Sequence, residues 1–151
     1  MTAAVNNANA YLRTKVLTAS PEELRLMLLE GAIKFLRQGR DGLERKDHEA
    51  SFDGFSKCRN IVLELMNSVR PDIAPDLCGR VTSLYTFIYT KLVEAGFERD
   101  LVKADKVIEM LEFERETWAL AMQKAAEERQ SPGAASTEPA RAPAAPLCVQ
   151  G

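Results

Sequence analysis

The side chains best suited to metal binding or nucleophilic catalysis are few and widely spaced in this sequence. Its single histidine is His48, and its three cysteines, Cys58, Cys78 and Cys148, form no Cys-x-x-Cys pair. An odd number of widely spaced cysteines is typical of neither a zinc site nor a disulfide framework, so we interpret these three as reduced thiols of a cytosolic protein. Di-iron and di-manganese bundles need Glu-x-x-His motifs, which one histidine in a predicted turn cannot supply.

Motifs for phosphates and polyanions are missing as well. Neither Gly-x-Gly-x-x-Gly nor Gly-x-x-x-x-Gly-Lys-Ser/Thr occurs in the sequence. The 20 basic and 22 acidic residues give a net charge of −2, which does not favour a nucleic-acid backbone. A pairing of His48 with a serine or cysteine in space stays open. The sequence therefore predicts a protein that is not an enzyme, that has no cofactor or metal and that binds no nucleic acid.

The chain of 151 residues, 46% of them apolar, is long enough for one domain with its own core. Residues 1–12 carry neither a charged side chain nor an apolar block, so both parts of a signal peptide are missing. The longest uncharged stretch of the region expected to fold, 81–90, is too short for a membrane helix of about 20 residues. We expect a cytosolic protein without membrane insertion.

The elements that must position any binding site are helices, because 22–70 and 76–130 lack proline and are rich in helix-forming residues. Ser20 is expected to cap a first helix, with Pro21 in its first turn and Glu23 completing a capping box. This helix is predicted to extend to about Glu44. Its apolar residues cover more than one stripe, so it is buried on two sides or lends one side to a partner; they are Leu24, Leu26, Met27, Leu28, Leu29, Ile33, Phe35 and Leu36.

Three further helices are predicted from apolar residues that repeat every three or four positions. The second spans about 47–69, with the seam Phe55, Cys58, Val62, Leu65 and Val69, and ends at Arg70-Pro71-Asp72. The third spans about 75–95, with Leu77, Val81, Leu84, Ile88, Leu92 and Ala95, and Gly96 as its cap. The fourth spans about 100–128, with Ala104, Ile108, Leu111, Trp118, Met122 and Ala125.

Four helices with short connections predict an all-α fold, an antiparallel up-down four-helix bundle over 20–130. The N-terminal arm, 1–19, shows little helical pattern. The segment 131–151 holds four of the seven prolines and almost no large apolar side chains, which predicts a disordered tail.

Several strings resemble the family of flagellar secretion chaperones that bind flagellin, the FliS family. They are Asn9-Ala10-Tyr11, Val16-Leu17-Thr18-Ala19-Ser20-Pro21 and Met27-Leu28 followed by Gly31-Ala32. Later matches are Glu64-Leu65-Met66-Asn67, the tyrosine pair in Leu84-Tyr85-x-x-Ile88-Tyr89-x-x-Leu92-Val93-x-Ala95, and Trp118. The resemblance covers about residues 6–126. It departs from the family pattern where Leu29-Glu30 replaces Tyr-Asp and where Met66 separates Leu65 from Asn67.

The resemblance implies a cytosolic export chaperone that works without ATP and holds the C-terminal, self-assembling segment of flagellin before type III secretion. We expect this client to contact apolar residues, namely Tyr11, Leu24, Leu28, Leu29, Ile61, Leu65, Tyr85, Tyr89 and Leu92. In the family, the matching arm covers the client site of the empty chaperone, so Tyr11 is expected to fill an apolar groove.

Two questions about partners remain open from the sequence. The client-free protein is expected to be a monomer or a weak homodimer, and an export-gate component or a co-chaperone is a further candidate partner. The alternative function is a self-associating helical adaptor or scaffold, whose surplus apolar surface would form a homodimer.

Overall fold

The computed structural model describes residues 2–68 and 75–130, and the regular structure of these residues is entirely helical. The five helices are α1 (Thr2–Thr18), α2 (Pro21–Glu44), α3 (His48–Asn67), α4 (Pro75–Glu98) and α5 (Leu101–Gln130). The all-helical fold is thus confirmed. The predicted tail with Cys148, the helix stop at 70–72 and Val69 lie outside the described residues, as do the side chains of Leu77 and Cys78.

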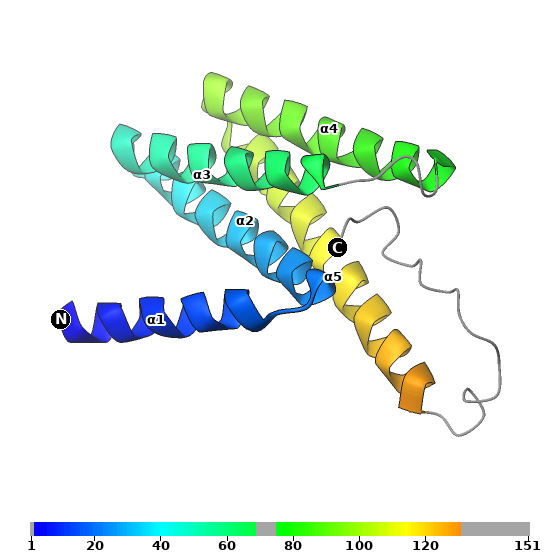
Figure 1. The fold of residues 1–151 in the computed structure, drawn as a ribbon. Helices are drawn as coiled ribbons and strands as arrows, with labels where there is room; N and C mark the ends of the chain where they lie inside the picture. Colours follow the sequence, from blue (N-terminus) through cyan, green and yellow to red (C-terminus); the bar gives the residue numbers. More distant parts are fainter. Residues whose placement is uncertain (1, 69–74, 131–151) are drawn as a thin grey trace.

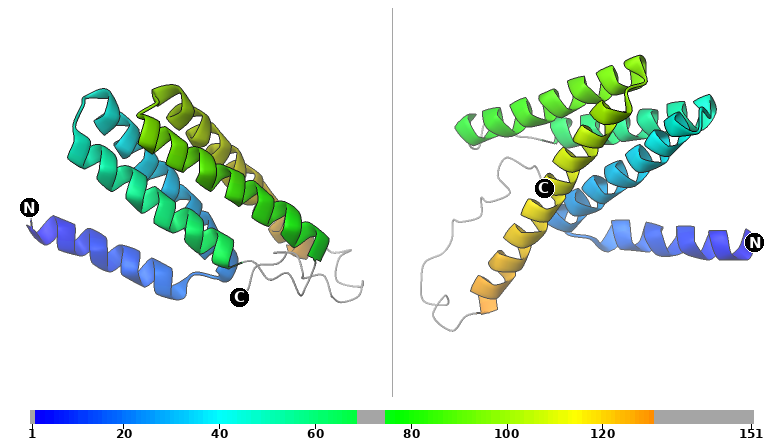
Figure 2. Two further views of the ribbon diagram at one scale, coloured as in Figure 1. Left: turned by 90° about the horizontal axis from the view of Figure 1, so that it is seen from above. Right: turned by 180° about the vertical axis from the view of Figure 1, so that it is seen from behind.

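Helices α2 to α5 pack around one core, and each of them contacts two of the others (Figure 1). α2 lies against α3 and α5, and α4 lies against the same two helices from the other side. The fully buried side chains include Leu29 and Leu36 of α2, Phe55 and Val62 of α3, and Leu111 of α5. The turned views show α1 leaving this group of four helices as a separate rod (Figure 2).

The helix at the N-terminus was not predicted, because 2–18 contains many asparagine and threonine residues, which favour helix weakly. Two of its threonines bond within the helix, with Thr14 Oγ1 donating to the carbonyl of Ala10 at 3.0 Å and Thr18 Oγ1 to that of Thr14 at 2.9 Å. Every residue described from Ala3 to Thr18 is exposed. No stripe of α1 is buried, so its sequence lacks the apolar periodicity that indicates a packed helix.

The start of α2 is confirmed in detail. Ser20 adopts an extended conformation, its Oγ accepts the backbone N–H of Glu23 at 3.1 Å, and its own N–H donates to the Glu23 carboxylate at 3.3 Å. Aspartates cap the next helices in the same way. Asp47 accepts from Ala50 before α3, and Asp100 accepts from Val102 and Lys103 before α5. The starts of α2, α3 and α5 are therefore set by side-chain hydrogen bonds between residues that are close in the sequence.

Glycines bring α2 and α3 into backbone contact. A Cβ atom added to Gly42 would lie 2.7 Å from the backbone nitrogen of Ser51, and one added to Gly39 would lie 2.9 Å from that of Phe55. A Cβ on Gly54 would collide with the backbone of Gly39. The glycines late in α2 therefore allow the two helices to pack closely.

The end of α4 differs from the prediction. Gly96 does not cap the helix, because α4 continues to Glu98 and the residue with a left-handed conformation is Arg99, with φ of 55°. A second left-handed residue, Lys46 with φ of 62°, closes the turn between α2 and α3. Neither position carries the glycine that usually marks such a turn, so these turns could not be predicted from the residue types.

The apolar seam of α4 differs from the prediction at one position, whereas Val81 packs against the core as predicted. Leu84 was expected in the core but is 36% exposed, whereas Tyr85 is fully buried. The seam continues as predicted through Ile88, Leu92 and Ala95, all buried. A tyrosine can take the core position here because its hydroxyl group finds hydrogen-bond partners inside the bundle.

Candidate docking surfaces

The structure divides the residues expected to contact a client into a buried set and an accessible set. Four of them are fully buried in the core: Leu29, Leu65, Tyr85 and Leu92. These four cannot touch a partner while the bundle is closed. Leu24 and Tyr11 are exposed, and three more pack half-buried against the edge of the core, namely Leu28, Ile61 and Tyr89.

The accessible residues of α2 form a second apolar stripe beside the buried one. Leu24, Leu28, Gly31 and Phe35 are spaced by four, three and four residues, so they share one side of the helix. α3 extends this side, because the Ile61 side chain lies 3.4 Å from where a Gly31 Cβ would stand. We name these five residues the outer α2–α3 face. The second stripe of α2 is thus partly buried against the core rather than fully buried or fully exposed.

A lysine borders the upper end of this face. The Lys57 ammonium lies 5.2 Å from the centre of the Phe35 ring, close enough for a cation–π contact between α3 and α2. Lys57 also pairs with Asp53 at 3.0 Å, so its charge is balanced on its own helix. A second lysine, Lys34 of α2, lies 5.9 Å from the centre of the same ring. The outer α2–α3 face is therefore a mainly apolar surface with two lysines at its edge.

The N-terminal segment does not cover this face in the structure. Tyr11 lies on α1 with 67% of its surface exposed, and it fills no groove. Other large apolar residues of α1 are exposed as well, namely Val5, Leu12, Val16 and Leu17. The expected covering contact of Tyr11 is absent, because α1 extends from the start of α2 as a separate helix whose described side chains are exposed (Figure 1).

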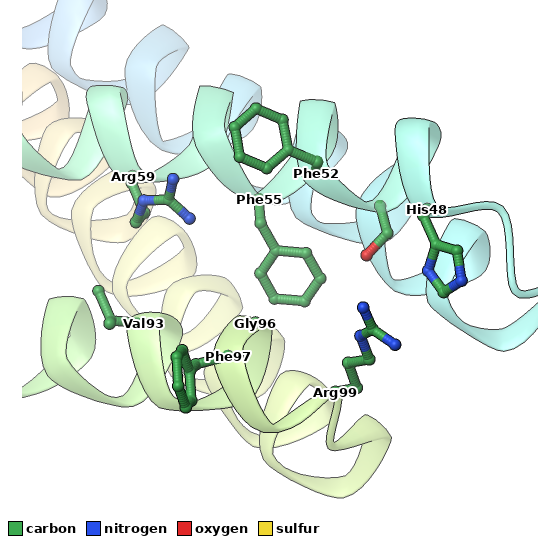
Figure 3. Close-up of a pocket in the computed structure, with 9 residues that line it drawn as sticks. His48, Phe52, Phe55, Arg59, Val93, Gly96, Phe97 and Arg99 are labelled. Atoms are coloured by element: carbon green, nitrogen blue, oxygen red, sulfur yellow. The ribbon is translucent and has the colours of Figure 1, made fainter.

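A pocket of about 420 Å³ between α3 and α4 was not anticipated from the sequence. We name it the α3–α4 pocket; its lining residues are His48, Ser51, Phe52, Phe55, Arg59, Val93, Gly96, Phe97 and Arg99 (Figure 3). Phe52 and Phe97 are 70% and 88% exposed. The available signal was the pair of phenylalanines outside the predicted seams, at positions that a bundle core does not require.

A buried polar network joins the beginning of α2 and the middle of α4 to α5. Arg25 is only 6% exposed, donates to the Tyr85 hydroxyl at 3.0 Å and lies over the rings of Tyr85 and Trp118. The same hydroxyl donates to the Glu114 carboxylate at 2.9 Å. Burial raises the pKa of Tyr85 far above its usual value, so the phenol stays protonated and can donate.

Two bonds extend this network to α3 and to the beginning of α2. Arg25 donates to Ser68 Oγ, after the end of α3, at 3.4 Å, and Trp118 Nε1 donates to the carbonyl oxygen of Glu22 at 3.0 Å. Trp118, expected as a seam residue, thus also satisfies a backbone group in the first turn of α2. We read this network as structural, because its groups are paired with one another.

The described residues show no metal site and no membrane-spanning helix, and Cys58 is not a reactive thiol. Within 2–68 and 75–130, no group of three or more histidine, cysteine or acidic side chains is placed to hold a metal ion. Among the helices of these ranges, none is long and apolar enough to cross a membrane. Burial raises the pKa of the Cys58 thiol to about 12, which leaves it protonated and unreactive at neutral pH.

The sequence matches the family model described as flagellar protein FliS over residues 4–125. A protein of Bacillus subtilis named flagellar secretion chaperone FliS is 30% identical over 128 residues, which cover 85% of this chain and 95% of that protein. The proteins of the same name from Salmonella typhimurium and Vibrio cholerae are 27% and 25% identical, over 74% and 66% of this chain and 83% and 74% of their own lengths. The match includes α1 to α4 and most of α5, and the chain therefore belongs to the FliS family of flagellar proteins.

Proposed function

We propose that this protein is a cytosolic export chaperone that binds the C-terminal segment of flagellin, prevents its premature polymerisation and assists its secretion. The relatives named above are flagellar secretion chaperones, a role that involves no catalysis. The single observation that carries the proposal is the outer α2–α3 face, an apolar helix side on which Leu24 is exposed and the other four residues are only partly buried.

The geometry of this face suits an amphipathic helix of the client. Grooves and faces that bind such helices present apolar anchors at helical spacing, as Leu24, Leu28 and Phe35 do on α2. We propose that the antiparallel bundle of α2 to α5 stays closed and that the client lies along this face. Contacts to the buried Leu29, Leu65, Tyr85 or Leu92 would require the bundle to open, so we place the client against the accessible residues.

Copurification tests the proposal directly. The protein should retain full-length flagellin and lose flagellin that lacks its C-terminal segment. Leu24→Asp should weaken retention because a carboxylate then replaces an exposed anchor on the face. Leu120→Asp is the matched control, since Leu120 is exposed on α5. Equal retention of both flagellins, or equal loss with both variants, would contradict the proposal.

The salt dependence of binding gives a second test of the same surface. Because the contacts are apolar and Lys57 is already paired, flagellin should remain bound at 1 M salt, where charges are screened within about 3 Å. An affinity that collapses between low and high salt would indicate a charged interface elsewhere. Docking of an export-gate component or a co-chaperone stays a prediction that rests on the family resemblance.

One observation favours the alternative, a self-associating adaptor. α1 exposes five large apolar side chains and buries none, and such a surface can pair with a second copy. Sedimentation of the client-free protein over a range of dilutions separates the two functions. A dimer that persists at high dilution favours the adaptor, whereas a monomer that forms a one-to-one complex with flagellin favours the chaperone.

A further inference from the structure

The α3–α4 pocket differs in its chemistry from the outer α2–α3 face. Three phenylalanine rings form its walls and floor, and Phe97 is the most exposed large apolar side chain of the described residues. Three groups that can carry positive charge, on His48, Arg59 and Arg99, also line it, whereas none of its described lining residues is acidic. An apolar hollow with basic borders is complementary to a ligand that is both apolar and acidic.

The positive groups stand at the two ends of the pocket. Figure 3 shows Arg59 on one side of the Phe55 ring and Arg99 with His48 on the other. Arg59 donates to Ser56 Oγ at 3.1 Å, a neutral partner that leaves its charge uncompensated by that bond. Along the groove, a basic side chain at one end is thus followed by an aromatic ring in the middle and by basic side chains at the other end.

The spacing on α3 defines the shape of the ligand. His48, Phe52, Phe55 and Arg59 are separated by four, three and four residues, so they share one side of α3 over about three turns, roughly 16 Å. Gly96 of α4 faces Phe55 with no side chain, which keeps the middle of the groove open. A helix lying along the groove would present its own side chains with the same period.

We infer that the α3–α4 pocket binds an amphipathic helix of a partner protein that carries two acidic residues about three turns apart and large apolar residues between them. The segment α1, from this or a second copy, is mismatched, because its charged side chains are Arg13 and Lys15. A polyanion is disfavoured by the aromatic floor and by the net charge of −2. The inference does not rest on the proposed function, since the surface and its ligand are assayed without flagellin.

A pair of synthetic peptides tests the inference on the full-length protein. The first is an alanine- and glutamine-based helix of about 18 residues. It carries four substituted positions spaced by four, three and four residues, with glutamates at the first and last of them and leucines at the two between. The second has lysines in place of the two glutamates. Fluorescence anisotropy should give an affinity for the acidic peptide at least about tenfold higher than for the basic one, and raised salt should reduce it.

Variants of the protein locate the binding. Arg59→Glu combined with Arg99→Glu should lower the affinity for the acidic peptide about tenfold and raise the affinity for the basic peptide. Lys106→Glu, on the exposed side of α5, is the matched charge control and should change neither. Phe97→Ser should weaken the binding of both peptides, while Phe113→Ser, at a phenylalanine of α5 that is 72% exposed, should not.

The outcomes separate clearly. Binding of the acidic peptide that falls with the α3–α4 variants and survives the α5 controls supports the inference. Equal affinity of the unaltered protein for both peptides overturns the inference. This comparison does not depend on whether the variants fold. Loss of binding with the α5 controls as well overturns the placement in this pocket.

Discussion

The two sides of α3 are built in opposite ways. Toward α2, Gly39, Gly42 and Gly54 let the two backbones touch, and no side chain could be inserted. Toward α4, a phenylalanine ring packs on Gly96 and the space beside it stays open as the α3–α4 pocket. Glycine on both helices seals an interface, whereas glycine on one helix opposite an aromatic ring leaves room beside the ring. The contrast separates the structural side of α3 from the side available to a ligand.

The largest effect is expected where the backbones touch. Gly54→Ala places a Cβ against the backbone of Gly39, which cannot move aside, so the free energy of unfolding should fall by about 3 kcal/mol. Gly79→Ala is the control, because its Cβ meets nothing within 4 Å. That exposed helical position should instead gain about 0.5–1 kcal/mol. Urea unfolding measures both, and equal changes would contradict the contrast.

A smaller loss is expected where polar bonds rather than glycines join the helices. Tyr85→Phe removes the hydroxyl that accepts from Arg25 and donates to Glu114, leaving a buried guanidinium with a weaker set of partners. The cost should be about 2 kcal/mol. Tyr11→Phe, whose hydroxyl stays in water, should cost nothing measurable in the same denaturant titration. A Tyr85→Phe protein as stable as its parent would mean that the network contributes no net stability.

The cap of α2 should contribute less again. Ser20→Ala removes the oxygen that accepts the Glu23 N–H, and the expected loss is about 1 kcal/mol. Chemical unfolding measures it, with circular dichroism to confirm the helix content. An unchanged denaturation midpoint would show that the beginning of α2 is held by the Trp118 bond to Glu22 and not by the Ser20 cap.

The smallest effect is expected on the open side of α3. Gly96→Ala puts a Cβ 3.3 Å from Phe55 Cδ1, and the ring can shift by a few tenths of an ångström toward the pocket. The gain in helix propensity offsets the crowding, so stability should stay within about 0.5 kcal/mol of the parent. Thermal unfolding of Gly96→Ala beside Gly54→Ala compares the two sides of α3 with one chemical change. A loss at Gly96 as large as that at Gly54 would remove the distinction.

The sequence by itself determined the helices that have local signals. Ser20 with Glu23, the proline-free segments and the repeated apolar residues predicted α2 to α5 within a few residues, because caps and burial periodicity are encoded in neighbouring positions. The family resemblance was likewise readable from short strings around Tyr11, Ser20 and Trp118, and the match over 4–125 confirms it.

Only the tertiary structure decided which apolar residues are accessible. Leu28 and Leu29 are neighbours of the same type, yet Leu28 belongs to the outer α2–α3 face and Leu29 is fully buried, since the rotation of a helix against its partners is not a local property. The same holds for Tyr85, whose burial depends on Arg25 and Glu114 from other helices. The α3–α4 pocket joins α3 residues to α4 residues more than 30 positions away, so it could not be predicted from residue spacing along the chain.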